Sequence, residues 1–416
     1  MSEHLLTLSM IVKNEEMFLA DCLRSVEGIV DEIIIVDTGS TDRTVEIAKS
    51  FGARVIEIEW PHDFAKARNV GLDAVTTQWV LIMDADEEFV REDTQVLREA
   101  ITHPSADAYN IRIISLMDRA EDITESYVTR LVRSHPQLRF QGAVHEQLFH
   151  SVVEAKMTLR ELNVRLTHKG YLNAVMKERD KHERNRRLLE SHVARNPQDI
   201  YMLWQLSQSY FGESRFDEAL LTVRRALKLA TQDNPIWTLC MTTYARILVQ
   251  MGQRKKAIRV LQDGKLAHPK YTDFWYQEGI IHFNLKEWVR AEACFQECLA
   301  LGEAQGYLAT DTGIGGFKSL YRIAQTWMMR HDGKQALAYL LLTLKQQPLY
   351  RSAWRGVFEL MAGQTIGEVG SAITLSLAPE VIVQTLSSWP DPDDNEKHLL
   401  AWARERLSTL PANQQG

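Results

Sequence analysis

Four alanines recur at similar spacing in the second half of the chain. Ala219, Ala257, Ala291 and Ala336 are separated by 38, 34 and 45 residues. A small residue at such a period indicates a repeated structural unit, because each unit must pack closely on the next to bury its apolar side. Beyond about Met176 strand patterns disappear and helix patterns continue. These features predict an all-helical solenoid in the carboxyl-terminal half.

Residues around the four alanines support the same register. Small and apolar residues precede each alanine at similar offsets, and Pro269 and Pro348 lie where the second helix of a repeat would end. The pattern resembles a tetratricopeptide (TPR) array of about four units, whose aromatic residues we interpret as core. The preceding residues are Leu203, Leu206, Ser207 and Tyr210; Tyr244, Ala245 and Leu248; Trp275, Gly279 and His282; and Leu320, Ile323, Ala324 and Trp327.

The amino-terminal part has a different pattern. Up to about residue 135, β-rich runs alternate with amphipathic helices, which predicts an α/β domain with a mostly parallel sheet covered by helices. Asn14 and Asp63 are candidate N-caps for the first and third of these helices. The predicted strands are 6–12, 32–36, 54–58 and 79–83, and the predicted helices are 15–27, 41–51 and 64–75.

The fourth predicted strand runs directly into two carboxylates, Asp84 and Asp86. Two hard oxygen ligands at the carboxyl edge of a sheet suit Mg²⁺ or Mn²⁺, which completes its coordination shell with phosphate oxygens and water. Two earlier loops, at 13–15 and 37–42, should open at the same edge. We therefore expect the three segments to converge on one site.

Asp37 ends the second predicted strand, and Gly39 follows it in the loop. An acid at this place can accept hydrogen bonds from a ribose or a uracil N–H, and Gly39 lets the backbone come close to a ligand. The alternative is a plain strand end before a well-capped helix.

These segments, followed by the run 60–69 and then Asp84-Ala85-Asp86, resemble the family 2 glycosyltransferases with the GT-A fold. The resemblance covers roughly residues 5 to 170. It implies a Rossmann-like sheet and transfer of a sugar from a nucleotide diphosphate donor with inversion at the anomeric carbon. A metal-bound diphosphate is a good leaving group, because the metal stabilises its developing charge.

The resemblance also implies roles for individual residues. Asp86 is similar to the principal metal ligand, and Asp84 to the acid near the ribose or the metal. The remaining donor-binding residues would be Lys13, Asn14, Glu15, Asp37, Gly39, Arg68 and Asn69, with Asp37 at the nucleoside and Arg68 and Asn69 near the base and diphosphate.

Inverting members of the family deprotonate the acceptor with an acid in a loop after the sheet, and Glu146 is the acid best placed for this. The family's usual acidic pair is replaced here by His145-Glu146. If the segment is extended, the two side chains face opposite sides, so one is catalytic and the other structural. His168 is either a third metal ligand through its imidazole or a hydrogen-bonding residue between domains.

Length and composition exclude several classes. A chain of 416 residues suits two or three domains, and its net charge of -7 argues against a chain-wide nucleic-acid surface. No apolar run approaches 18 residues and no basic leader is present, so we expect a cytoplasmic protein without a transmembrane segment. The cysteines contain no CxxC pair and are interpreted as reduced packing residues rather than a metal site; they are Cys22, Cys240, Cys294 and Cys298.

We expect a GT-A domain at 1–175, a linking helix at 176–200, about four repeats at 201–350 and a helical cap and tail at 351–416. The combination resembles bacterial TPR-linked transferases that include the sublancin-type peptide S-glycosyltransferases. It implies a UDP-sugar donor and a peptide or protein acceptor, with the array holding the acceptor or a second copy of the chain. The alternatives are a cell-surface glycan transferase, and a TPR scaffold whose sheet domain binds nucleotide without turnover.

Overall fold

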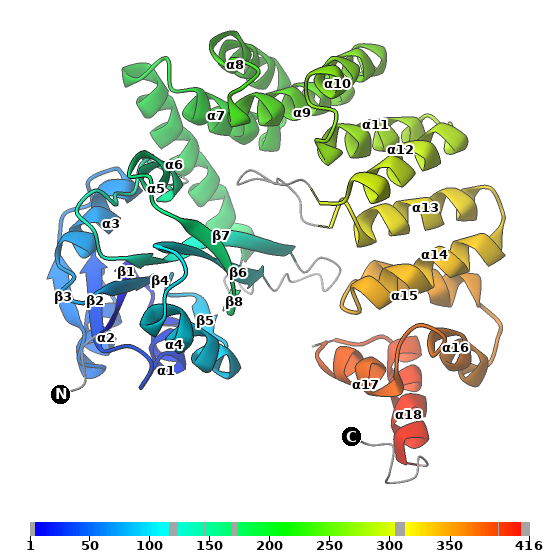
Figure 1. Ribbon diagram of the computed structural model, residues 1–416, viewed down its shortest axis with the longest axis horizontal. Coiled ribbons are helices and arrows are strands. Elements are labelled where there is room, and N and C mark those ends of the chain that lie inside the picture. Colours follow the sequence, from blue (N-terminus) through cyan, green and yellow to red (C-terminus); the bar gives the residue numbers. More distant parts are fainter. Residues whose placement is uncertain are drawn as a thin grey trace. The chain divides into compact units, whose positions relative to one another are not determined.

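The structure, a computed structural model, describes residues 5–115, 124–144, 146–168, 174–303, 313–389 and 391–408. The described residues divide into two compact units, one extending up to Ser209 and the other beginning at Tyr210. All of the described strands belong to the first unit (Figure 1). The second unit is helical throughout its described part.

The first unit is built on an eight-stranded sheet with the strand order β3-β2-β1-β4-β7-β6-β8-β5. The pairings within β1 to β4 are all parallel, and so is the pairing of β6 with β8. Strand β7 is antiparallel to both of its neighbours, β4 and β6, and β5 is antiparallel to β8. The predicted α/β, GT-A-like fold with a mostly parallel sheet is therefore confirmed. The strands are β1 (Leu6–Val12), β2 (Glu32–Asp37), β3 (Arg54–Glu57), β4 (Trp79–Ile82), β5 (Glu87–Phe89), β6 (Ala108–Ser115), β7 (Thr124–Arg133) and β8 (Leu159–His168).

Both faces of the sheet are covered, because successive side chains of a strand point to opposite sides. In β4, Trp79 and Leu81 belong to one core, together with side chains from α1, α2 and α4. Val80 and Ile82 belong to a second core on the other face, with α3 and α5. These helices are α1 (Leu19–Ser25), α2 (Thr44–Ser50), α3 (Phe64–Asp73), α4 (Thr94–Thr102), which follows the short η1 (Arg91–Asp93), and α5 (Phe149–Glu154).

One predicted helix start is right and another is wrong. Helix α3 begins at Phe64 as predicted, and the Asp63 carboxylate accepts a hydrogen bond from the Lys66 N–H at 3.0 Å. Helix α1 begins only at Leu19, and Asn14 does not cap it. Asn14 Oδ1 instead accepts from the Thr41 N–H at 2.8 Å, because tying two sheet-edge loops together satisfies this amide better than capping a distant turn.

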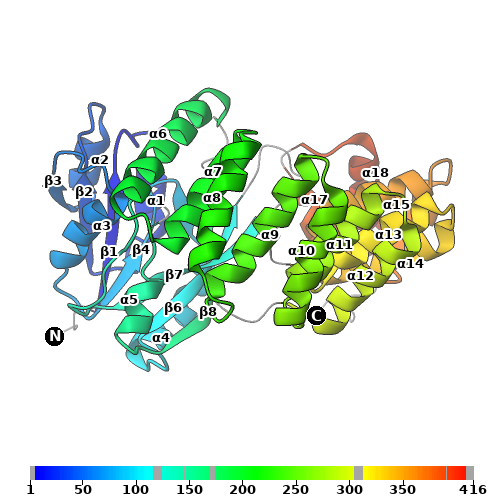
Figure 2. The same ribbon diagram turned by 90° about the horizontal axis from the view of Figure 1, so that it is seen from above.

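Two helices, α6 (Ala174–Arg195) and α7 (Ile200–Gly212), follow the last strand. From α8 to α15 each helix packs against the next, and Figure 2 shows this succession. None of the described helices is both long enough and apolar enough to cross a membrane. The remaining helices are α8 (Phe216–Leu229), α9 (Pro235–Gln250), α10 (Arg254–Ala267), α11 (Thr272–Asn284), α12 (Trp288–Leu301), α13 (Phe317–Met329), α14 (Gly333–Gln346), α15 (Arg351–Leu360), α16 (Ile366–Ile373), α17 (Pro379–Ser387) and α18 (Asp394–Ser408).

The four recurring alanines occupy equivalent places. Each is the fourth residue of a 14-residue helix, respectively α8, α10, α12 and α14, and each is 0% exposed. The residue two places before each of these helices has a positive φ: Ser214 (60°), Gly252 (75°), Lys286 (62°) and His331 (60°). The predicted solenoid register is confirmed at the level of side-chain burial and of backbone geometry.

Candidate active site

The loops after β1 and β2 are joined by hydrogen bonds, as the sequence predicts for a shared sheet edge. The Asn14 N–H donates to Ser40 Oγ at 2.9 Å, and the Glu15 N–H donates to Thr44 Oγ1 at 2.7 Å. Lys13 lies beside them with an exposed side chain. The structure thus brings the segment 13–15 together with the segment 37–42.

Asp37 is only 3% exposed and shapes its own loop. Its Oδ2 accepts hydrogen bonds from the Gly39 and Ser40 N–H groups, both at 3.0 Å, and its Oδ1 accepts from Ser40 Oγ. Gly39 has φ +100°, a backbone conformation that residues with a side chain rarely adopt. The loop therefore depends on both residues, and their contact with a nucleoside stays a prediction.

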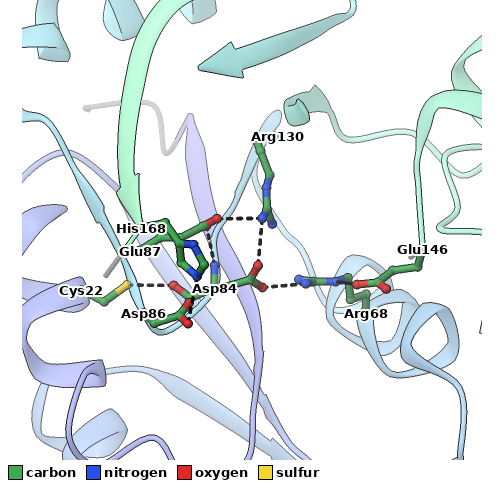
Figure 3. A network of polar contacts seen from close by, with 8 residues as sticks. All are labelled: Cys22, Arg68, Asp84, Asp86, Glu87, Arg130, Glu146 and His168. Carbon is green, nitrogen blue, oxygen red and sulfur yellow. Dashed lines mark hydrogen bonds and ion pairs between the residues drawn. The ribbon is translucent and has the colours of Figure 1, made fainter. Parts of the chain in front are cut away.

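Asp84 lies between two arginines, Arg68, which is buried, and Arg130, whose side chain is 11% exposed (Figure 3). Its Oδ1 accepts from Arg68 Nη2 at 2.6 Å, and its Oδ2 accepts from Arg130 Nη2 at 2.8 Å. Burial alone would raise the pKa of Asp84, but the charges of Arg130 and Arg68 outweigh burial and hold the pKa well below its usual range. The role of Asp84 as a metal ligand stays a prediction. To bind an ion, one of its two carboxylate oxygens would have to give up its hydrogen bond to Arg68 or Arg130.

Glu87 completes this cluster. Arg130 Nη2 also donates to Glu87 Oε1 at 2.8 Å, and the Asp84 N–H donates to Glu87 Oε2 at 2.8 Å. Burial raises the pKa of Glu87 to about 7, and the neighbouring Asp84 adds to the rise while Arg130 opposes it. Burial therefore favours the neutral form of Glu87 within the cluster.

Glu146 reaches the same cluster from a different loop. Its Oε1 accepts from Arg68 Nε at 2.6 Å, so a single guanidinium joins Glu146 to Asp84 (Figure 3). Its other oxygen, Oε2, has no hydrogen-bond partner among the described residues and is available to accept a proton. His145, the other predicted catalytic residue, lies outside the described residues.

Asp86 and His168, both predicted to bind metal, are brought together by the sheet. Strand β5 pairs with β8 so that Glu87 lies opposite His168, and His168 Nε2 is 3.1 Å from Asp86 Oδ2. The hydrogen bond to Asp86 raises the pKa of His168, although burial opposes the rise. Both side chains keep about a quarter of their surface exposed, at 25% for His168 and 22% for Asp86.

The charge of this site suits a divalent cation. Two arginines, Arg68 and Arg130, contact three carboxylates, and a fourth lies beside His168, so with every acid ionised and His168 neutral the formal sum is +2 and −4, or −2. The carboxylates are Asp84, Asp86, Glu87 and Glu146. Asp86 and His168, an oxygen and a nitrogen ligand that are not held by arginine, fit such an ion better than Asp84 does.

Two buried donors in the cluster have no hydrogen-bond partner among the described residues, Arg68 Nη1 and Arg130 Nε. An unpaired buried N–H is costly, so donors of this kind are usually satisfied by a ligand or by water. Guanidinium groups bind phosphate oxygens well, and these two donors lie beside the segment predicted to hold a diphosphate.

The loop that carries Glu146 is supported from two sides. Asn69, predicted to lie near the base and diphosphate, exchanges two hydrogen bonds with the backbone of Phe140, at 2.8 and 3.0 Å. From α7, Tyr201 Oη accepts from Gln147 Nε2 at 2.9 Å. Asn69 therefore positions the start of the Glu146 loop, and its donor-binding role stays a prediction.

Sequence reasoning missed Arg130 and Glu87. Glu87 follows Asp86 directly, so the acidic run 84–88 contained a signal for it. Arg130 lies within β7 with no local motif, and only the pairing of β7 with β4 brings it to Asp84. A strand that looks ordinary in sequence thus supplies one of the central charges of the site.

Residues 7–163 match glycosyl transferase family 2. The chain is 35% identical over 230 residues to a TPR repeat-containing protein of Synechococcus elongatus, covering 53% of this chain and 56% of that protein. It is 25% identical over 224 residues to the SPbeta prophage-derived glycosyltransferase SunS of Bacillus subtilis, covering 53% of each.

The chain spans about half the length of the curated relatives it matches. Among solved structures, S. aureus TarS matches with a TM-score of 0.38 and 14% identity, over 61% of this chain and 54% of that one. A TPR protein of Thermus thermophilus matches with a TM-score of 0.35 and 19% identity, over 44% of this chain and 94% of that one.

Proposed function

We propose that this chain, whose residues 7–163 form a family 2 glycosyltransferase domain, is an inverting glycosyltransferase that moves a sugar from a UDP-sugar to a peptide or protein side chain. The family match and the relatives named as glycosyltransferases support sugar transfer. The donor, the inversion and the acceptor are our inference from the site and from the helical repeats that follow in the chain.

The observation that carries the proposal is the Arg68 bridge. Arg68 holds Asp84, at the end of β4, and Glu146, in the loop before α5, within 2.6 Å of one guanidinium. Arg68 thereby holds Asp84, the acid predicted to lie near the donor, close to Glu146, the acid proposed to take the proton. A transferase needs this proximity, because the nucleophile must lose its proton while the diphosphate leaves.

In the proposed reaction Glu146 Oε2 takes the proton from the acceptor hydroxyl or thiol. The acceptor atom forms a bond to the anomeric carbon as the bond from that carbon to the diphosphate oxygen breaks, and the electron pair leaves with UDP. Arg68 Nη1 and Arg130 Nε, which have no partner among the described residues, would donate hydrogen bonds to the departing diphosphate. Arg68 also fixes the orientation of Glu146 through Oε1.

Asp86 and His168 would hold a divalent cation, Mg²⁺ or Mn²⁺, which supplies positive charge to the diphosphate when bound. Their mutual hydrogen bond holds both side chains in place before the ion binds. Glu87 holds the turn that carries Asp86, because its carboxylate accepts the Asp84 N–H. These residues act on the leaving group, on the side of Asp84 away from Glu146.

The acceptor class is inferred from the helical repeats. Stacked helix pairs form an extended surface suited to a peptide or to a second copy of the chain. We therefore propose that the array holds the acceptor, and that a homodimer is its alternative use. Light scattering of the full chain, with and without an acceptor peptide, separates the two.

The test compares Glu146→Gln with Glu161→Gln, a matched change at an exposed position of β8. We expect Glu146→Gln to cut sugar transfer by about 100-fold or more while the affinity for the UDP-sugar stays within a few-fold. Glu161→Gln should leave both unchanged. Transfer is followed by UDP release, and donor binding by calorimetry.

Equal loss of binding and turnover in Glu146→Gln would mean that Glu146 shapes the pocket rather than takes a proton. Binding of UDP-sugar without release of UDP in the native chain, across peptide and glycan acceptors, would favour a nucleotide-binding scaffold. Transfer to a glycan alone would replace the peptide acceptor and keep the enzyme.

A further inference from the structure

Helices α11 and α12 form the third repeat and enclose a group of three metal-suited side chains. Glu278 and His282 lie one turn apart on α11, so they project from the same face, and Cys294 projects from α12. All three are buried, at 6%, 7% and 7% exposure. One oxygen, one nitrogen and one sulfur from these residues lie within 4.8 Å of one another.

The imidazole of His282 is already oriented as a ligand would be. Its Nδ1 donates to Glu287 Oε2 at 2.6 Å, which leaves Nε2 as the lone-pair nitrogen facing the other two residues. A carboxylate on the far nitrogen is the usual partner of a metal-bound histidine, because it fixes the ring and raises its basicity. Glu287 comes from the turn between the two helices, so the hairpin supplies this support itself.

Glu278 is likewise held by one oxygen and open at the other. Its Oε2 forms an ion pair with Lys265 Nζ at 2.6 Å, and that ammonium lies 3.7 Å from the centre of the Trp275 ring. Its Oε1 lies 3.5 Å from His282 Nε2. Two ligands on one tetrahedral zinc, with bonds of about 2.1 Å, are separated by about 3.4 Å. The spacing of these two atoms therefore already matches that of two zinc ligands.

We propose that Glu278 Oε1, His282 Nε2 and Cys294 Sγ bind one Zn²⁺ inside the third repeat. An oxygen, a nitrogen and a sulfur are all ligand types that zinc accepts, and a sulfur ligand disfavours Mg²⁺ and Mn²⁺. With the thiol ionised, Zn²⁺ and Lys265 bring a charge of +3 against −3 from Cys294, Glu278 and Glu287, and the exposed Arg290 adds one further positive charge at Glu287. The ion would cross-link α11 to α12.

This inference is independent of sugar transfer, and it departs from our expectation that the cysteines only pack. The site has no CxxC motif that would predict it from the sequence, because its three ligands come from two helices. The competing arrangement contains no metal. In it a protonated His282 lies between Glu278 and Glu287, and Lys265 completes a buried ion network.

The test is a titration of chelator-treated full-length protein with Co²⁺, which replaces zinc and gives thiolate-to-metal absorption when a cysteine binds it. We expect this absorption to saturate at one Co²⁺ per chain and to disappear when Zn²⁺ is added. It should be absent in Cys294→Ser. Cys298→Ser is the matched control, because Cys298 lies one turn further along α12, is also buried at 0% exposure, and directs its Sγ to the Thr272 carbonyl. It should keep the absorption.

Absence of thiolate absorption in the native chain overturns the proposal whether or not any variant folds. Persistence of the absorption in Cys294→Ser, with loss in Cys298→Ser, overturns it as well. Melting of the native chain gives a second reading, since Zn²⁺ should raise its melting temperature and should not raise that of His282→Gln. If Zn²⁺ raised the melting temperature of the native chain and of His282→Gln equally, the stabilising ion would be bound at another site.

Discussion

The sheet unit and the helical unit use buried charge in different ways. In the sheet unit, Arg68 and Arg130 contact carboxylates that lie 16, 43, 46 and 78 residues away in the chain. Each of these two arginines also has one buried N–H without a partner among the described residues. In the helical unit, Arg351 uses its guanidinium to hold Glu396 in a two-point contact. The two arginines of the sheet unit therefore keep a donor available for a ligand, whereas the Arg351–Glu396 pair is satisfied within the protein.

The two units also differ in how far a local change should spread. A side chain of the site is fixed by several strands and loops at once, so its loss acts on the whole cluster. A side chain of the array contacts its own repeat and the next, and stability is then approximately a sum over repeats. The effect of a substitution should therefore grow with the number of chain segments that meet at the substituted residue.

The largest effect should come from Arg68→Met. It leaves Asp84 with one arginine and Glu146 with none, and breaking a buried ion pair from one side costs about 3–5 kcal/mol. We expect a loss of that size in urea unfolding of the sheet unit, together with loss of UDP-sugar binding by calorimetry.

Arg351→Met is the matched change in the helical unit, since Arg351 is 5% exposed and Glu396 is 0% exposed. It should cost a similar free energy of unfolding and leave UDP-sugar binding unchanged. If both variants abolish donor binding, the two units are not energetically separate and the comparison fails.

The second effect concerns the cation. Asp86→Asn should reduce UDP release by about 100-fold, which corresponds to about 2.7 kcal/mol of barrier, because it removes the carboxylate best placed for the ion. EDTA should reduce the native enzyme to a similar rate, and Mn²⁺ should restore it. The urea midpoint should change little, since Asp86 is partly exposed. Turnover that is unaffected by EDTA contradicts the proposed ion at Asp86.

The third effect tests the array alone. Ala336→Leu forces extra volume between α14 and its neighbours, where Ala336 is 0% exposed, and should cost about 1–3 kcal/mol. Lys334→Ala, at an exposed position of the same helix, should fall within about 0.5 kcal/mol of the native chain. Both are measured by urea unfolding, with UDP-sugar affinity as the second reading. A fall in donor affinity for Ala336→Leu would show that repeat packing controls the site.

The smallest effect tests the equivalence of the repeats. Ser214, Lys286 and His331 are exposed and have positive φ at the same repeat position as Gly252. Replacing each by glycine should raise the free energy of unfolding by up to about 1 kcal/mol, because the left-handed conformation strains a side chain. Gly252→Ala should lower it by about 1 kcal/mol. Unequal signs among the three glycine variants would mean that the four turns are not equivalent.

Sequence reasoning succeeded where a pattern is local. The four strands were found within a residue or so of their ends, because buried runs and turn residues mark them. The repeat register was found from four alanines, because close helix packing excludes larger side chains at those positions. Asp63 as an N-cap was also predictable, since a cap contacts only the turn that follows it.

Sequence reasoning was less successful where a side chain serves another segment. Asn14 was expected to cap α1 and instead holds the β2–α2 loop. Asn69 holds the backbone of Phe140, a contact that the sequence does not predict, and its donor-binding role stays a prediction. Arg130 was not considered, since nothing near it in the chain signals a role. In each case the partner is more than 25 residues away.

The sequence by itself determined the two architectures and the acidic segment at the end of β4, because periodicity, caps and turn residues act over a few residues. Only the tertiary structure decided that Arg68 joins Asp84 to Glu146, that Arg130 and Glu87 belong to the same cluster, and that Asp86 meets His168. The physical reason is that these contacts depend on strand order and register. The pairing of β5 with β8 places His168 beside Asp86, 82 positions earlier in the chain, and no local preference encodes that contact.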